Sequence, residues 1–177
     1  MADIKEFISK YSNYQTTFKE VSFDNQNNQH LCLDETISTF NFDAIISDIY
    51  QNPMTYRPKS FDSIFIDGNT IYCIEFKNER KPDKTELEQK LLDGKKELEK
   101  LLVAQNIQKD EYKFIFCLVY NIFKPKEERY KRGILSYPLK MYLQKHKETN
   151  FVDDIFTEDV EFFSQQFKKK MGRKLVC

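Results

Sequence analysis

The segment from Ser60 to Lys77 constrains the fold of this chain more than any other. Two runs rich in Ile, Phe and Tyr flank the sequence Asp-Gly-Asn, and this combination predicts a β-hairpin. Either Gly68-Asn69 or Asp67-Gly68 can form the two-residue turn. The hairpin therefore defines two neighbouring strands and leaves two registers open.

The charged side chains of this hairpin fall together on one face. Because side chains alternate between the faces of a strand, Glu75 and Lys77 share a face. With Gly68-Asn69 as the turn, Asp62 lies directly opposite Glu75, and with the other turn it lies diagonally on the same face. Directly opposed residues have Cβ atoms about 5 Å apart, and like charges at such positions are destabilising. Mg²⁺, which takes oxygen ligands at about 2.1 Å, would remove that repulsion, so the hairpin predicts a metal site.

The rest of the chain predicts helices and further strands around the hairpin. We expect helices over residues 3–11, 34–50, 85–105 and 138–147 and from about 157 to 170, a loop over 12–30, a buried strand over 112–120, and one more strand near 30–33 or 56–59. A long helix between two strands is typical of a parallel crossover connection. The fold class predicted is α/β, bordering on α+β, with a mixed β-sheet flanked by helices.

Length indicates the number of domains, and the placement of charge indicates the kind of partner. A chain of 177 residues predicts a single domain over residues 1–177, and its net charge of zero does not by itself indicate a nucleic-acid partner. The charge is unevenly placed, however, because residues 124–147 hold eight Lys or Arg and two Glu. Such a positive segment favours nucleic acid. The candidate contacts are Lys124, Lys126, Arg129, Lys131, Arg132 and Lys140.

The cysteines and apolar runs indicate the cellular setting. Cys73 and Cys117 lie in apolar runs and are predicted to be buried, reduced thiols. A zinc site using His30, Cys32 and a strand cysteine is an alternative, although its spacing differs from the usual motifs. We find no signal peptide and no apolar run near 18 residues in the sequence. We therefore expect a soluble, cytoplasmic protein without a membrane partner.

The order of these features resembles the PD-(D/E)xK nuclease superfamily, whose restriction-endonuclease-like core has the order αβββαβ. The resemblance rests on Asp62, the tripeptide Glu75-Phe76-Lys77 after a short gap, the leucine-striped helix and the buried strand. It covers residues from about 36 to 122, which leaves 123–177 as a basic, aromatic extension. Two further Glu-x-Lys tripeptides, starting at Glu88 and Glu111, lack this context.

This resemblance implies a Mg²⁺-dependent phosphodiesterase, with Mn²⁺ as a substitute. It implies that Asp62, Glu75 and the backbone carbonyl of Phe76 bind the metal. Lys77 would orient or deprotonate the attacking water. An acid on the first helix often joins this set, and Asp43 is preferred here to Asp48 because Asp48 lies beside the apolar stripe of that helix.

The sequence departs from the family pattern at two points. Phe61 precedes the aspartate where the family name has a proline, and many members lack that proline. The glutamine-tyrosine signature of the recombination-exonuclease branch is absent, because Asp93 stands four residues after Gln89. The second departure disfavours that branch.

Three functional hypotheses follow. The first is a metal-dependent endonuclease, on DNA more than on RNA, which could act as a homodimer if it cuts duplex DNA symmetrically. The second is an inactive module with the same core that binds nucleic acid or a protein partner through the basic segment. The third is a structural adaptor that binds neither metal nor nucleic acid. The hairpin alone is also consistent with an ordinary hairpin in which Lys77 forms a surface salt bridge with Glu75 or Asp62, worth about 0–1 kcal/mol.

Overall fold

The structure is a computed structural model that describes residues 4–78, 82–120, 129–171 and 177. In chain order its elements are α1 (Ile4–Lys10), the 3₁₀ turn η1 (Ser12–Tyr14), β1 (Gln15–Thr17), α2 (Phe18–Val21), β2 (Phe23–Asp24), β3 (Gln29–His30), β4 (Ser38–Asn41), α3 (Phe42–Ile49), β5 (Ser63–Asp67), β6 (Thr70–Lys77), α4 (Lys84–Val103), η2 (Lys109–Glu111), β7 (Lys113–Tyr120), α5 (Arg129–Glu148), β8 (Asp154–Asp159) and α6 (Val160–Met171).

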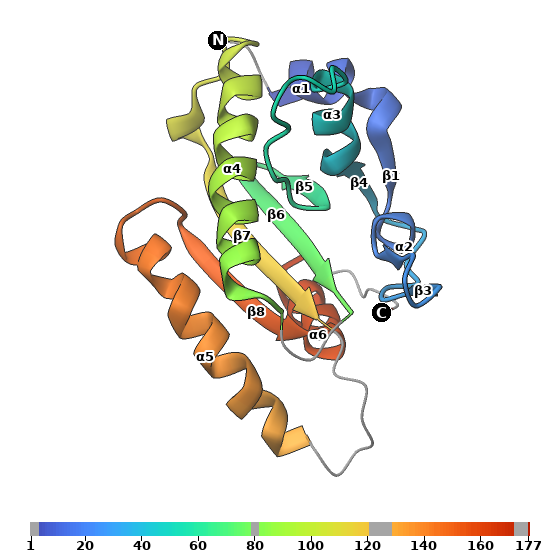
Figure 1. Ribbon diagram of the computed structural model, residues 1–177, viewed down its shortest axis with the longest axis vertical. Coiled ribbons are helices and arrows are strands. Elements are labelled where there is room, and N and C mark those ends of the chain that lie inside the picture. Colours follow the sequence, from blue (N-terminus) through green and yellow to red (C-terminus); the bar gives the residue numbers. More distant parts are fainter. Residues whose placement is uncertain (1–3, 79–81, 121–128, 172–176) are drawn as a thin grey trace.

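The centre of the molecule is a six-stranded mixed sheet with the strand order β1-β4-β5-β6-β7-β8 (Figure 1). Strands β1, β4, β5 and β6 pair antiparallel, whereas β6, β7 and β8 pair parallel. The long helix α4 connects β6 to its parallel neighbour β7. Strands β2 and β3 form a separate two-stranded ribbon. The predicted class, α/β with a mixed sheet flanked by helices, is confirmed.

Helices cover both faces of the sheet. On one face, apolar residues of α1, α3, α4 and α5 pack in one core with residues of β5, β6 and β7. On the other face, α2 and α6 pack against β6 and β7 in a second core. Both faces of β7 are therefore buried, as its almost wholly apolar sequence predicted. Among the helices that the structure describes, none is long and apolar enough to cross a membrane.

The register of the central hairpin agrees with one of the two predicted turns. Asp67 pairs with Thr70 and Ser63 pairs with Ile74, so Gly68-Asn69 is the turn. Gly68 has a φ of 56°, a conformation that glycine adopts without steric cost. The alternative turn is wrong. The same register, continued by one residue, brings Asp62 opposite Glu75.

Several predicted element boundaries were wrong. The helix expected over 34–50 spans only Phe42–Ile49, because Ser38–Asn41 pairs with β1 and β5 as a strand. Asn41 then caps α3 by accepting a hydrogen bond of 2.9 Å from the Ala44 N–H. The expected loop over 12–30 contains η1, β1, α2, β2 and β3, and residues 56–59 form no strand.

The C-terminal region also differs from the prediction. Helix α5 begins at Arg129, not near Pro138, and so includes that proline. Residues 154–159 form β8, so the last helix begins at Val160 and not near Thr157. The acidic residues that suggested a helix start lie mostly in this strand, where parallel pairing with β7 outweighs local helix propensity.

Candidate active site

Two carboxylates meet where β5 begins and β6 ends. Asp62 Oδ2 accepts a hydrogen bond of 2.7 Å from the backbone N–H of Phe76, which fixes this aspartate to the neighbouring strand. The Glu75 side chain is fully buried, whereas that of Asp62 is 26% exposed. The predicted pair is therefore brought together, with one member fully buried and the other partly exposed.

Two lysines flank this pair. Lys77 Nζ lies 3.6 Å from Glu75 Oε1 and 3.3 Å from Glu86 Oε1. Lys90, from α4, approaches more closely, because its Nζ lies 2.6 Å from Glu75 Oε1 and 3.7 Å from Asp62 Oδ1. Sequence reasoning placed Lys77 here and missed Lys90. The available signal was the position of Lys90 beside the buried stripe of α4, directly before Leu91.

A close contact between α4 and the segment just before β5 sets the position of Lys90. A Cβ at Gly94 would lie 2.6 Å from two ring atoms of Phe61, so only glycine allows the helix to come this near. The Phe61 ring in turn stacks on Phe42, with centroids 4.6 Å apart. Phe61 precedes Asp62, and Gly94 lies about one helical turn after Lys90. The contact therefore holds the helix over the carboxylates.

Burial and charge act against each other in this cluster. Burial raises the pKa of Asp62, while the positive charge of Lys90 acts to lower it. Burial and then the charge of Asp62 raise the pKa of Glu75 to about 8. Burial acts to lower the pKa of Lys90, but the charges of Glu75 and Asp62 outweigh it and raise that pKa. Asp62 and Glu75 thus both interact with the ammonium group of Lys90.

One carboxylate oxygen of this cluster is available to bind a further cation. Glu75 Oε2 is buried and has no hydrogen-bond partner among the described residues. Within those residues, no group of three His, Cys, Asp or Glu side chains is arranged to hold a metal. Mg²⁺ is commonly bound through one or two carboxylates with water and substrate phosphate as the other ligands. Asp62 and Glu75 fit that type of site.

The site opens into a cavity of about 620 Å³. Asp62, Glu75, Phe76, Lys77 and Lys90 contribute to its lining from one side. The turn between β2 and β3 contributes from the other, although these strands are far from β6 in the sequence. The charged cluster is therefore accessible to a small ligand or to part of a larger one.

The acidic residues of α3 that were considered as metal ligands form hydrogen bonds away from the site. Asp43 Oδ1 accepts hydrogen bonds from Arg57 Nη2 at 2.7 Å and from Ser60 Oγ at 2.6 Å. Asp48 accepts a hydrogen bond of 2.6 Å from the Tyr14 hydroxyl. Neither acid lines the cavity. Asp43 acts on the site only through its charge, which contributes to the raised pKa of Asp62.

The predicted basic surface is described only in part. Lys140 lies exposed on α5. Arg129, Lys131 and Arg132 belong to the first turns of that helix, but their side chains lie outside the described structure, as do Lys124 and Lys126 altogether.

The cysteines divide into two kinds. Cys73 and Cys117 are buried thiols, which confirms their prediction. Cys32 forms a disulfide with Cys177, which the sequence analysis did not predict. The sulfur of Cys32 is therefore not a free thiol that could bind zinc, and His30 Nδ1 lies 2.7 Å from the carbonyl oxygen of Lys19. The zinc site considered for His30 and Cys32 is therefore wrong.

Comparison with protein-family models, with curated proteins and with solved structures finds no match for this chain. The geometry of the carboxylate–lysine cluster is therefore the ground on which a function is assigned.

Proposed function

We propose that this protein is a Mg²⁺-dependent nuclease that hydrolyses phosphodiester bonds, acting on DNA as an endonuclease. One observation carries the proposal: Asp62, Glu75 and Lys77 converge on one cavity, where a buried oxygen of Glu75 has no partner among the described residues. The antiparallel pairing of β4, β5 and β6, with α4 and the parallel strand β7 after them, supports a restriction-endonuclease-like core. The order differs from αβββαβ at one point, because α3 lies between β4 and β5.

The division of labour follows from the positions of the side chains. Asp62 and Glu75 would hold the metal, and the Phe76 N–H keeps Asp62 in place for that role. When bound, Mg²⁺ supplies positive charge to the scissile phosphate and makes the attacking water more acidic. Lys77 would take or hold the proton of that water. Glu86 Oε1 lies 3.3 Å from Lys77 Nζ and would hold this side chain in place for that role.

Lys90 supports a second candidate function. Its ammonium lies 2.6 Å from Glu75 and already supplies a positive charge to the carboxylate pair. A protein that keeps this ion pair permanently would have the nuclease-like core without turnover. It would then bind nucleic acid or a protein partner, with exposed Lys140 as one contact.

Cleavage assays with matched variants test the proposal. Plasmid DNA, linear duplex, single-stranded DNA and RNA are incubated with the protein and Mg²⁺ or Mn²⁺. We expect cleavage by the wild type and loss of cleavage in Asp62→Asn, Glu75→Gln and Lys77→Ala. Lys113→Ala is the control, because this exposed lysine ends another Glu-x-Lys tripeptide.

Two outcomes count against the nuclease. If cleavage survives all three substitutions, the catalytic residues are not those of this site. A purified wild type that binds nucleic acid in a salt-dependent way, yet cuts none of the four substrates with either metal, is the inactive binding module.

A further inference from the structure

The cavity has a polar wall beside the carboxylate–lysine cluster that the proposed chemistry does not use. This wall consists of the turn between β2 and β3 together with Asn78, the residue after β6. Asn25, Gln26 and Asn27 of the turn carry amide side chains, which pair with the donors and acceptors of other polar groups.

Asp24 fixes this wall in one arrangement. Its Oδ1 accepts hydrogen bonds from the backbone N–H groups of Gln26 at 2.9 Å and Asn27 at 3.4 Å. Its Oδ2 accepts from the side-chain amides of Asn27 at 2.6 Å and Asn78 at 2.7 Å. A single carboxylate thus ties the turn to the end of the catalytic strand.

The same hydrogen bond determines how the Asn78 amide is oriented. An ionised carboxylate only accepts, so the Nδ2 group of Asn78 must face Asp24 and its Oδ1 must face away. That Oδ1 is buried and has no partner among the described residues. It is one of four such side-chain atoms among the residues that the structure describes, and another is Glu75 Oε2, whose residue lines the same cavity.

The wall also carries an aromatic ring. Phe23 lines the cavity and is 37% exposed, which is unusual for a phenylalanine in this protein. Its ring centroid lies 4.7 Å from that of His30, so the neighbouring strand supports the ring. A supported, exposed ring provides a surface on which a planar ligand can stack.

We propose that this wall is a subsite for the nucleobase beside the scissile phosphate, with Phe23 stacking on the base and Asn78 Oδ1 accepting a hydrogen bond from a base N–H. This inference rests on the proposed function, because it places the phosphate at the carboxylate–lysine cluster. A volume of 620 Å³ is in the range of pockets that hold one small ligand. A base that enters the pocket is unstacked from its neighbours, so the substrate is single-stranded DNA or a frayed or mismatched nucleotide.

Nucleotide titrations test the subsite without relying on cleavage. The four deoxynucleoside 5′-monophosphates and 2-deoxyribose 5-phosphate are each titrated in the presence of Mg²⁺ by calorimetry. We expect at least one nucleotide to bind about tenfold more tightly than the sugar phosphate, which lacks the base. Phe23→Ala and Asn78→Ala should each remove most of that difference.

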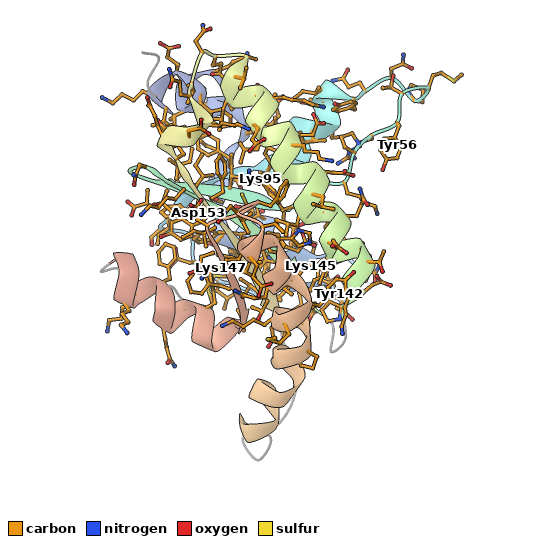
Figure 2. The ribbon with its side chains drawn as sticks, turned by 90° about the vertical axis from the view of Figure 1, so that its left-hand side faces the viewer. Tyr56, Lys95, Tyr142, Lys145, Lys147 and Asp153 are labelled. Atoms are coloured by element: carbon orange, nitrogen blue, oxygen red, sulfur yellow. A yellow bond between two sulfur atoms is a disulfide. The ribbon has the colours of Figure 1, made fainter. Side chains whose placement is uncertain are left out.

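Two matched variants serve as controls. Tyr56, which lies on a loop that projects from the body of the molecule, is 75% exposed (Figure 2). Asn13 is exposed in η1. Neither lines the cavity. Tyr56→Ala and Asn13→Ala should therefore bind the nucleotides as the wild type does.

The outcomes separate the subsite from the nuclease. Equal affinity for nucleotides and sugar phosphate, or unchanged nucleotide affinity in both Phe23→Ala and Asn78→Ala, overturns the subsite even if the protein cleaves DNA in a Lys77-dependent way. Base-dependent binding by a protein that cleaves nothing keeps the subsite and removes the proposed function. If cleavage occurs, a fully paired duplex cut as fast as single-stranded DNA contradicts the need for an unstacked base.

Discussion

Two glutamates in this molecule occupy opposite electrostatic situations. Glu75 is fully buried, its Oε1 lies near Lys90 and Lys77, and its Oε2 has no partner among the described residues. Glu88, on the same helix as Lys90, receives a hydrogen bond from the Tyr142 hydroxyl and lies 2.6 Å from Lys145 Nζ. His146 Nε2 also lies 2.7 Å from it.

The pKa values of the two side chains diverge accordingly. The pKa of Glu75 is raised to about 8, first by burial and then by the charge of Asp62. For Glu88, burial acts to raise the pKa, but hydrogen bonds from Lys145, Tyr142 and His146 outweigh it and lower the pKa to about 2. Figure 2 shows Tyr142 and Lys145 at the packing of α5 against α4.

The difference separates a fully paired acid from the acid on which the proposed function depends. Both oxygens of Glu88 have partners, so its charge serves to join α4 to α5. Glu75 is desolvated with an unused oxygen, an arrangement that costs stability in the absence of a cation. Costly, incompletely paired acids cluster at functional sites. The two glutamates therefore form a matched pair for experiments.

The largest difference is expected in catalysis. Lys77→Ala should reduce DNA cleavage by about 10³-fold, which is in the range expected for loss of general acid–base catalysis. Glu75→Gln removes a metal ligand and should reduce cleavage at least as much. Glu88→Gln should stay within about threefold of wild type, since its carboxylate lies outside the cavity lining. Initial rates on a fluorescent oligonucleotide measure this. Equal losses at Glu75 and Glu88 would show that the effect is structural.

The next difference is expected in metal binding. Mn²⁺ at about 100 times its Kd should stabilise the wild type by about 2.7 kcal/mol, which raises the Tm by several degrees. Glu75→Gln and Asp62→Asn should lose this shift, whereas Glu88→Gln should retain it. Thermal unfolding with and without Mn²⁺ measures the effect. A shift that persists without both carboxylates places the metal elsewhere.

A smaller difference is expected in stability without metal, and here the substitution at Glu88 should have the larger effect. Glu88→Gln should lower the free energy of unfolding by about 1–3 kcal/mol, because it weakens charge-assisted hydrogen bonds between two helices. Glu75→Gln should leave it unchanged or raise it, since the neutral amide still accepts from Lys90. Urea unfolding in EDTA measures both, with exposed Glu148→Gln as control. A larger loss for Glu75→Gln than for Glu88→Gln contradicts the contrast.

The sequence predicted one half of the candidate site better than the other. Asp62, Glu75 and Lys77 could be placed because a two-residue turn and the alternation of strand side chains determine which residues oppose each other. Local rules of this kind act over a few residues. The turn that faces the site across the cavity, from Asp24 to Asn27, comes from a segment assigned as loop. No local pattern relates that segment to Asn78.

Lys90 and Glu88 show the same limit on a helix. Both belong to a Glu-x-Lys tripeptide that the sequence analysis set aside as an ordinary surface pattern. Residues two apart on a helix face different directions, so Lys90 reaches the sheet while Glu88 reaches α5. Which neighbour each meets depends on tertiary packing, here on the contact of Gly94 with Phe61. The Cys32–Cys177 disulfide depends on tertiary packing in the same way.

The smallest difference is expected in how stability changes with pH. The folded pKa of Glu75, about 8, lies above its ordinary value of 4.5, so its protonated form favours folding. That contribution is complete below pH 4.5 and is lost as the pH rises through about 8. The folded pKa of Glu88, about 2, lies below 4.5, so its contribution is present above pH 4.5 and is lost as the pH falls through about 2.

Tm measured against pH in EDTA separates the two contributions. Glu75→Gln should flatten the decline of Tm between about pH 5 and 8, and Glu88→Gln should flatten its decline between about pH 4.5 and 2. The effect on Tm is modest because the charge of Lys90 partly compensates Glu75 across the upper window. If Glu75→Gln instead leaves the upper slope unchanged, the glutamate is ionised at its ordinary pKa. It would then be as well satisfied as Glu88, and the contrast between the two acids would be lost.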